Sequence, residues 1–179
     1  SFDVSDSIPD RLKVRFDILV EGSDTSWQSH FSIESHAPSL RIISLVINDA
    51  SGGNNNGRLD PGETVTVTIT NANRGYYHAL NAYGLLSCHS PYITLHNDSV
   101  YLDTLVMGQP KLSQFSLTVA DEAPSGTGIW LDYALHSQFH MQEAHYLETI
   151  GIIVEDWETG TFHKFPWQHF GNLPWTIST

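Results

Sequence analysis

Apolar and polar residues alternate along most of this chain, which is the period of a β-strand with one buried face. The alternation is cleanest over residues 12–20, 64–70 and 112–119. Residues 40–47 form a nearly continuous apolar run, which predicts a strand buried on both faces. Other strands are predicted over 30–35, 78–87, 92–95, 99–105, 129–136 and 145–154. Helical periodicity is nearly absent, so we expect an all-β protein.

Clusters of Gly, Pro, Asn and Asp separate these segments and predict turns. They fall at residues 21–24, 52–57, 71–75, 107–110 and 123–126. Many short strands joined by such turns are typical of a sandwich or a barrel. Residues 38–154 carry seven or eight strand signals, a number and a length that suit one immunoglobulin-like antiparallel β-sandwich.

The chain divides into three parts by composition. Residues 1–37 hold two or three predicted strands and are expected to be the end of a preceding β-domain or N-terminal strands. The boundary falls at Pro38, which cannot donate to a strand ladder and tends to stop a strand. Residues 38–154 would form the sandwich. Residues 155–179 hold three of the five tryptophans and are expected to be a linker and the truncated start of a following domain.

Charge excludes some partners. Eight Lys and Arg against 20 Asp and Glu give a net charge of −12, which would repel phosphate backbones and anionic lipid. We therefore expect no nucleic-acid and no membrane partner. One cysteine excludes an internal disulfide framework, and no apolar run reaches the length of a membrane-spanning helix. Few charged residues and much Ser, Thr, Asn and Gly favour an extracellular or cell-surface location.

One segment, residues 48–63, carries candidate chemistry. Its sequence is NDASGGNNNGRLDPGE, and calcium takes six to eight hard oxygens from such carboxylates, amides and carbonyls. With Gly57 as the sixth position of a calcium loop, the ninth and twelfth positions are Asp60 and Glu63. The other predicted metal ligands are Asp49, Asn54, Asn56 and the carbonyl of Arg58. Leu59 then takes the eighth, inward-facing position.

The loop departs from this pattern at its first position, where Gly52 stands in place of an Asp. Asp49 or Ser51 would have to reach in. Strands are predicted on both sides, so calcium would join one strand to the next and stabilise the folded state. The competing interpretation is a solvated Asn/Gly loop that binds nothing.

Other constellations have weaker support. His136, His140 and His145 do not have the spacing of a zinc site, and Cys88 is expected to be a buried apolar residue rather than a nucleophile. Trp27 and Trp130 are expected in the sandwich core or in an interface. The sequence contains no catalytic motif, so we expect no enzyme activity from this chain.

Residues 47–71 resemble the opening of accessory immunoglobulin-like domains in secreted bacterial peptidases and adhesins, of which the gingipain-like cysteine peptidases are the best-known carriers. Residues 151–175 are similar to the junction into a cleaved-adhesin-type jelly-roll module. The resemblance implies a metal-binding or turn-defining loop over Asp49, Asn54, Asn56, Asp60 and Glu63. It carries over no catalytic residue, because that family's catalytic Cys and His lie in a separate domain.

These observations and the resemblance predict a non-catalytic structural spacer module of a secreted or surface-anchored bacterial protein, a peptidase, with calcium in the loop. Its partners would be neighbouring domains of the same chain, and a host protein or glycan is a further candidate. The alternative is an adhesin or a carbohydrate- or protein-binding module that uses the aromatic residues of 155–179.

Overall fold

A computed structural model describes residues 2–151 and Gly171. Over these residues the chain forms ten strands and no helix. Their bounds are β1 Lys13–Glu21, β2 Ser26–Glu34, β3 Leu40–Asn48, β4 Thr64–Asn73, β5 Ala79–Ser87, β6 Ile93–Leu95, β7 Ser99–Leu105, β8 Lys111–Val119, β9 Thr127–Ser137 and β10 His140–Ile150. The described residues accordingly include no helix that could cross a membrane.

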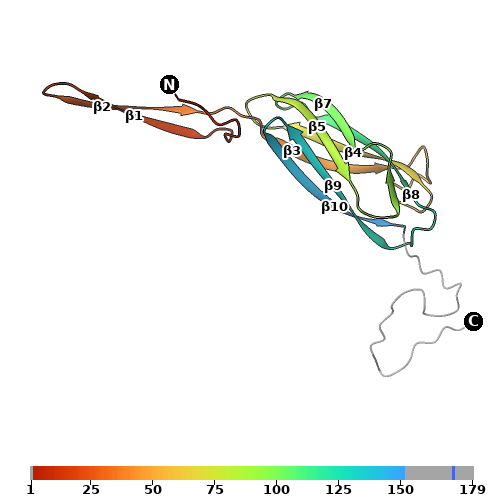
Figure 1. Cartoon of the computed structure of the whole chain (residues 1–179). Helices are drawn as coiled ribbons and strands as arrows, with labels where there is room; N and C mark the ends of the chain where they lie inside the picture. The colour runs from red at the N-terminus through yellow and green to blue at the C-terminus, as the bar shows by residue number, and fades with distance from the viewer. Residues whose placement is uncertain (1, 152–170, 172–179) are drawn as a thin grey trace, which may run out of the picture.

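Eight strands form a sandwich of two four-stranded antiparallel sheets (Figure 1). One sheet has the order β3-β4-β8-β6 and the other has the order β10-β9-β5-β7. This is the division of strands in immunoglobulin-like domains, with one extra strand beside the second sheet. The predicted fold class, an all-β immunoglobulin-like sandwich, is therefore confirmed.

The sequence alternation places every second side chain in the core. Val65, Val67 and Ile69 of β4 are buried against the inward residues of the opposite sheet. Leu131 and Leu135 of β9 belong to the same apolar cluster. Thr residues alternate with the buried positions of β4 and face outward, which explains the Val-Thr pattern of that strand.

The prediction for residues 40–47 is wrong in one respect. β3 is an edge strand, and it covers the core with one face only, so Ile43 and Val46 are exposed. A register shift between Ile42 and Ser44 interrupts the alternation. The bulge brings apolar residues onto both faces, which is why the run reads as continuous.

A polar group lies in the middle of the core. The hydroxyl of Tyr133 on β9 donates to Asn71 Oδ1 at 2.9 Å and lies 3.0 Å from Ser113 Oγ. Asn71 Nδ2 donates to Ser113 Oγ at 2.9 Å, so the three side chains satisfy one another across the two sheets. Gly84 makes room for the ring, since a Cβ there would lie 2.1 Å from the Tyr133 hydroxyl oxygen.

The remaining two strands, β1 and β2, form a hairpin that projects from one end of the sandwich (Figure 1). Its base is tied to the sandwich through Asp10, whose carboxylate accepts from the backbone N–H groups of Ala37 and Tyr76. Arg11 lies over the Tyr76 ring at 5.5 Å. Trp27 is on this hairpin and Trp130 faces outward from β9, so neither lies in the core, contrary to that part of the prediction.

Replacing Tyr133 by Phe should destabilise the sandwich by about 1–3 kcal/mol, because Asn71 and Ser113 lose a buried hydrogen-bond partner. Urea unfolding measures the change. Tyr101→Phe is the matched control, since the Tyr101 ring is exposed and its hydroxyl makes one long hydrogen bond to Asn81. Equal losses in the two variants would contradict the assigned role.

Candidate metal centre

The candidate site is the loop that joins β3 to β4, residues 49–63. It lies at the end of the sandwich where β10 finishes, because Leu59 forms a parallel bridge with Ile150. The hairpin is attached at the opposite end, beside Ala37 and Tyr76. The structure brings Asp49, Asn54, Asn56, Asp60 and Glu63 together through direct hydrogen bonds, as described below.

Asp49 is the most enclosed carboxylate of the loop, with 1% of its surface exposed. Its two oxygens accept from the backbone N–H groups of Asn56 at 2.9 Å and Gly57 at 3.0 Å. Desolvation by burial raises the pKa of Asp49, but the backbone hydrogen bonds from Gly57, Asn56 and Asn55 outweigh it, so the pKa falls below its ordinary value. Asp49 therefore stays ionised while buried, and its carboxylate holds the backbone of the loop at Asn56 and Gly57.

Two asparagines and Asp60 form the outer part of the loop. Asn54 Nδ2 and Asn56 Nδ2 both donate to Asp60 Oδ2, at 2.8 Å and 2.6 Å. The Oδ1 atoms of the same amides accept from the backbone N–H groups of Asn56 and Arg58. Each Asn thus makes a short turn with its own following backbone and gives its amide nitrogen to one shared carboxylate oxygen.

Glu63 completes the cluster from the first residue before β4. Only 8% of its surface is exposed, and its Oε1 accepts from the Asn54 backbone N–H at 2.8 Å. Its Oε2 is buried and has no hydrogen-bond partner. A buried, unpaired carboxylate oxygen is costly, so this atom is the unsatisfied point of the loop.

The glycines explain why the loop departs from the calcium-loop pattern. At Gly52, the first position, a Cβ would lie 2.5 Å from the Thr64 carbonyl oxygen, so no Asp fits there. At Gly53 a Cβ would lie 2.6 Å from the carboxyl carbon of Glu63. Asp49 enters the loop from three residues earlier instead, as one of the two sequence alternatives proposed.

Leu59 fastens the loop to the rest of the fold. Its side chain is 1% exposed and belongs to the core cluster, as expected for the inward-facing position. Its carbonyl oxygen accepts from the Gly151 N–H at 2.6 Å. The loop therefore holds both the apolar core and the end of β10.

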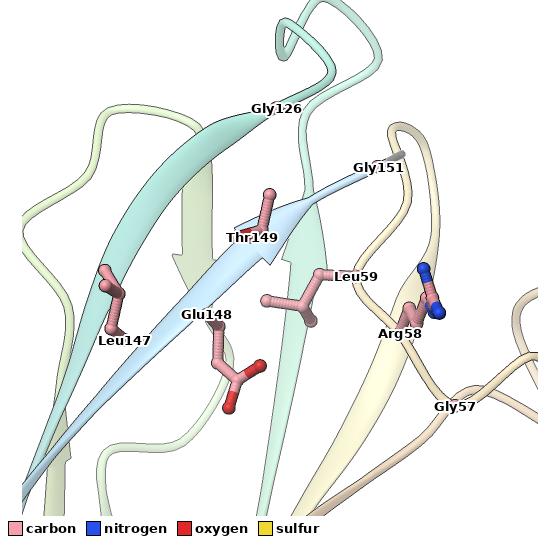
Figure 2. A pocket seen from close by; sticks show the side chains of 8 residues that line it. All are labelled: Gly57, Arg58, Leu59, Gly126, Leu147, Glu148, Thr149 and Gly151. Atoms are coloured by element: carbon pink, nitrogen blue, oxygen red, sulfur yellow. The ribbon is translucent and has the colours of Figure 1, made fainter. Parts of the chain in front are cut away.

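A hollow of about 480 Å³ lies between the loop and β10 (Figure 2). Gly57, Arg58 and Leu59 form one wall, and Glu148 points from β10 toward the space. Desolvation raises the pKa of Glu148 above its ordinary value. This hollow adds a carboxylate near the loop, but no hydrogen bond joins Glu148 to the predicted ligands among the described residues.

Sequence reasoning missed one neighbour of the loop. Asp121, in the turn after β8, lies against the loop backbone, since a Cβ on Gly62 would be 2.4 Å from its Oδ1. A residue so far along the chain gives no local signal. Over residues 2–151 and Gly171, no three His, Cys, Asp or Glu side chains gather closely enough to hold a metal ion by themselves. The predicted set depends also on amide and carbonyl oxygens.

The other residues that the sequence singled out lie on other elements of the fold. His136 and His145 lie on β9 and β10, where His145 Nδ1 is 2.6 Å from Asp132 Oδ1. Cys88 is half-buried beside the core, where desolvation raises the pKa of its thiol. The aromatic segment 155–179, on which the binding-module alternative depends, lies outside the described residues apart from Gly171.

Asp49→Asn should lower the unfolding midpoint at pH 7 in the presence of chelator. Because the pKa of Asp49 is lowered on folding, the ionised carboxylate stabilises the protein above the ordinary Asp pKa of about 3.9. That contribution is lost as the pH falls through the folded-state pKa. Thermal unfolding between neutral pH and about pH 3 should show the two proteins converging. Asp98→Asn, at an exposed carboxylate of the sandwich, should leave the midpoint unchanged.

Comparisons with family models and with curated proteins found no match for this chain. The resemblance seen in residues 47–71 stays a prediction, and the chemistry of the loop is argued from its own residues.

Proposed function

We propose that this chain is a non-catalytic structural module of a secreted or cell-surface protein, and that calcium bound by residues 49–63 stabilises it. The module would space and orient neighbouring domains of the same polypeptide. The proposal rests on one observation above the others. Glu63 Oε2 is buried without a hydrogen-bond partner, in the same loop as the buried carboxylate of Asp49.

The donor set suits calcium by its chemistry. Asp49, Asp60 and Glu63 supply carboxylates, and Asn54 and Asn56 supply amide oxygens, all of which are hard oxygen donors. Arg58 would contribute only its carbonyl. A cation would give Glu63 Oε2 the partner it lacks, and it would offset the repulsion among the carboxylates of this one loop.

Calcium would also have to displace hydrogen bonds. In the present arrangement the amide nitrogens of Asn54 and Asn56 occupy Asp60 Oδ2. These two bonds stabilise the charged Asp60 carboxylate without a metal, as the competing interpretation of a loop that binds nothing requires. Binding should therefore change the environment of the two Asn side-chain amides, a change that NMR detects directly.

A cation here would act on more than the loop. Residues 49–63 join β3 to β4, and Leu59 binds the end of β10 through the Gly151 N–H. Fixing the loop would therefore fix three strands at one end of the sandwich. A module that has to hold its neighbours in a set direction needs a rigid end of this kind.

The extracellular assignment draws on composition and on the resemblance of residues 47–71 to accessory domains of gingipain-like peptidases and adhesins. The net charge of −12 and the single cysteine agree with it. Extracellular modules commonly bind calcium with dissociation constants on the order of 10⁻⁴–10⁻³ M. An affinity in this range is sufficient for an extracellular module, and a loop whose first ligand comes from a displaced position could provide it.

Thermal unfolding with calcium and with excess chelator tests the proposal. A dissociation constant on the order of 10⁻⁴ M predicts a stabilisation of about 1.4 kcal/mol at about 1 mM calcium. That corresponds to a rise in midpoint of roughly 3–6 °C for a chain of about 150 residues. An unchanged midpoint, together with no calcium by elemental analysis, would contradict the proposal.

Glu63→Gln should remove most of the calcium-dependent rise, because it replaces a carboxylate by a neutral amide at the least satisfied position of the loop. Glu143→Gln is the matched control, since Glu143 is exposed on β10. The control should keep the full calcium response. Isothermal titration gives the affinity in each variant, and a loss of affinity common to both would contradict the assigned ligand.

A further inference from the structure

The hairpin β1–β2 has one apolar face and one polar face. Cross-strand partners point to the same side, and the pairs Val14–Ile33, Phe16–Phe31 and Val20–Trp27 all carry apolar side chains on one face. The Phe16 and Phe31 rings stack at 5.0 Å. Ile18 lies on the same face, opposite Ser29. The other face carries charges, with Arg15 paired to Asp17 at 2.8 Å and Glu34 beside Arg11 and Lys13.

The Phe2 ring packs on Phe16 at 5.0 Å, but nothing among the described residues covers the apolar face from Ile18 to the tip. The hairpin stands away from the sandwich (Figure 1), and Trp27 near its tip is 59% exposed. A two-stranded hairpin is marginally stable alone, and exposed apolar patches of this extent mark interaction sites. The face therefore needs a partner that is itself apolar.

The two ends of this face complement each other. At the base, Phe2, Val4 and Ile8 lie beside Val14 and Ile33 and enclose a hollow of about 250 Å³ with mostly apolar walls. At the tip, Trp27 offers a large exposed ring. Tip and base are six residues apart along the strand, roughly 20 Å. We propose that a second copy of this chain packs face to face on the hairpin in the antiparallel sense, with Trp27 of each copy in the base hollow of the other.

The middle of the face agrees with the same arrangement. A two-fold axis at the level of Asp17 and His30 brings Phe31 of one copy over Ser29 of the other, a large side chain over the smallest one of the face. It also brings Val14 over Val20. An interface of this kind is isologous, so one surface serves both copies.

The area is sufficient. Eight apolar side chains, including Phe2 and Val4, are 37–59% exposed, and together they present roughly 700 Å² per copy. The pair would bury about 1,400 Å², within the range of about 1,200–2,000 Å² that stable interfaces show. The sandwiches would lie at opposite ends of the paired hairpins, where they do not collide.

Sedimentation velocity on the 179-residue chain tests this interface. We expect a dimer of twice 20.0 kDa that dissociates on dilution. Trp27→Ser should weaken dimerisation about 30-fold or more, as expected for an aromatic anchor seated in a hollow of the partner. Leu19→Ser is the matched control, because Leu19 is 54% exposed on the opposite face of the same hairpin, and it should leave the association unchanged.

A covalent test fixes the geometry. With Cys88 replaced by Ser, Val14→Cys and Val20→Cys together should give a covalent dimer on a gel after treatment with a thiol cross-linker of about 10 Å span, because facing sheets lie about 10 Å apart, too far for a direct disulfide. Within one copy the two positions are roughly 20 Å apart, beyond the reach of this cross-linker. A monomer at about 100 µM would overturn the proposal. So would a dimer that loses no affinity in Trp27→Ser, since it would use another surface.

Discussion

The burial of Leu59 is the constraint on which this end of the molecule depends. A loop rich in charged and amide side chains would ordinarily be solvated and unanchored, but the side chain of Leu59, its eighth position, packs in the apolar core. That single side chain holds the middle of the loop against the core, while the pairing of β3 with β4 places Asp49 and Glu63 at its two ends. It also places the Leu59 carbonyl where β10 ends, so that the Gly151 N–H reaches it. The polar chemistry of the loop is therefore positioned by an apolar contact.

Much of this could be predicted from the chain. Period-two alternation gave the strands of the sandwich, and the spacing of Gly57, Leu59 and Glu63 correctly placed Leu59 inward. The sequence could not show why Gly52 departs from the pattern, because the obstacle is the carbonyl of Thr64, a contact made only after folding. Asp121 was missed for the same reason. The double-sided burial predicted for 40–47 failed because a bulge mimics a continuous apolar run.

The hairpin shows a different limit of sequence reading. Its alternation is as regular as that of β4, and the pattern alone does not say what the apolar face packs on. In β4 the partner is the opposite sheet of the same sandwich. In β1 and β2 the partner has to come from elsewhere, so Trp27, expected in the core or in an interface, is exposed on the projecting hairpin. The proposed calcium loop and the hairpin that carries the proposed dimer face are attached at opposite ends of the sandwich.

The bond between Gly151 and Leu59 has a mechanical consequence. The chain enters the sandwich near Ala37 and leaves it after Ile150, at the far end (Figure 1). Tension applied between these two points would run along β3 and β10. It would load the parallel bridge between Leu59 and Ile150 in shear. Bonds loaded in shear share the load and break together, whereas bonds at a peeling edge break one at a time. The loop would then hold the end of β10 in place, and the rigidity of the loop would set the force at which β10 begins to detach.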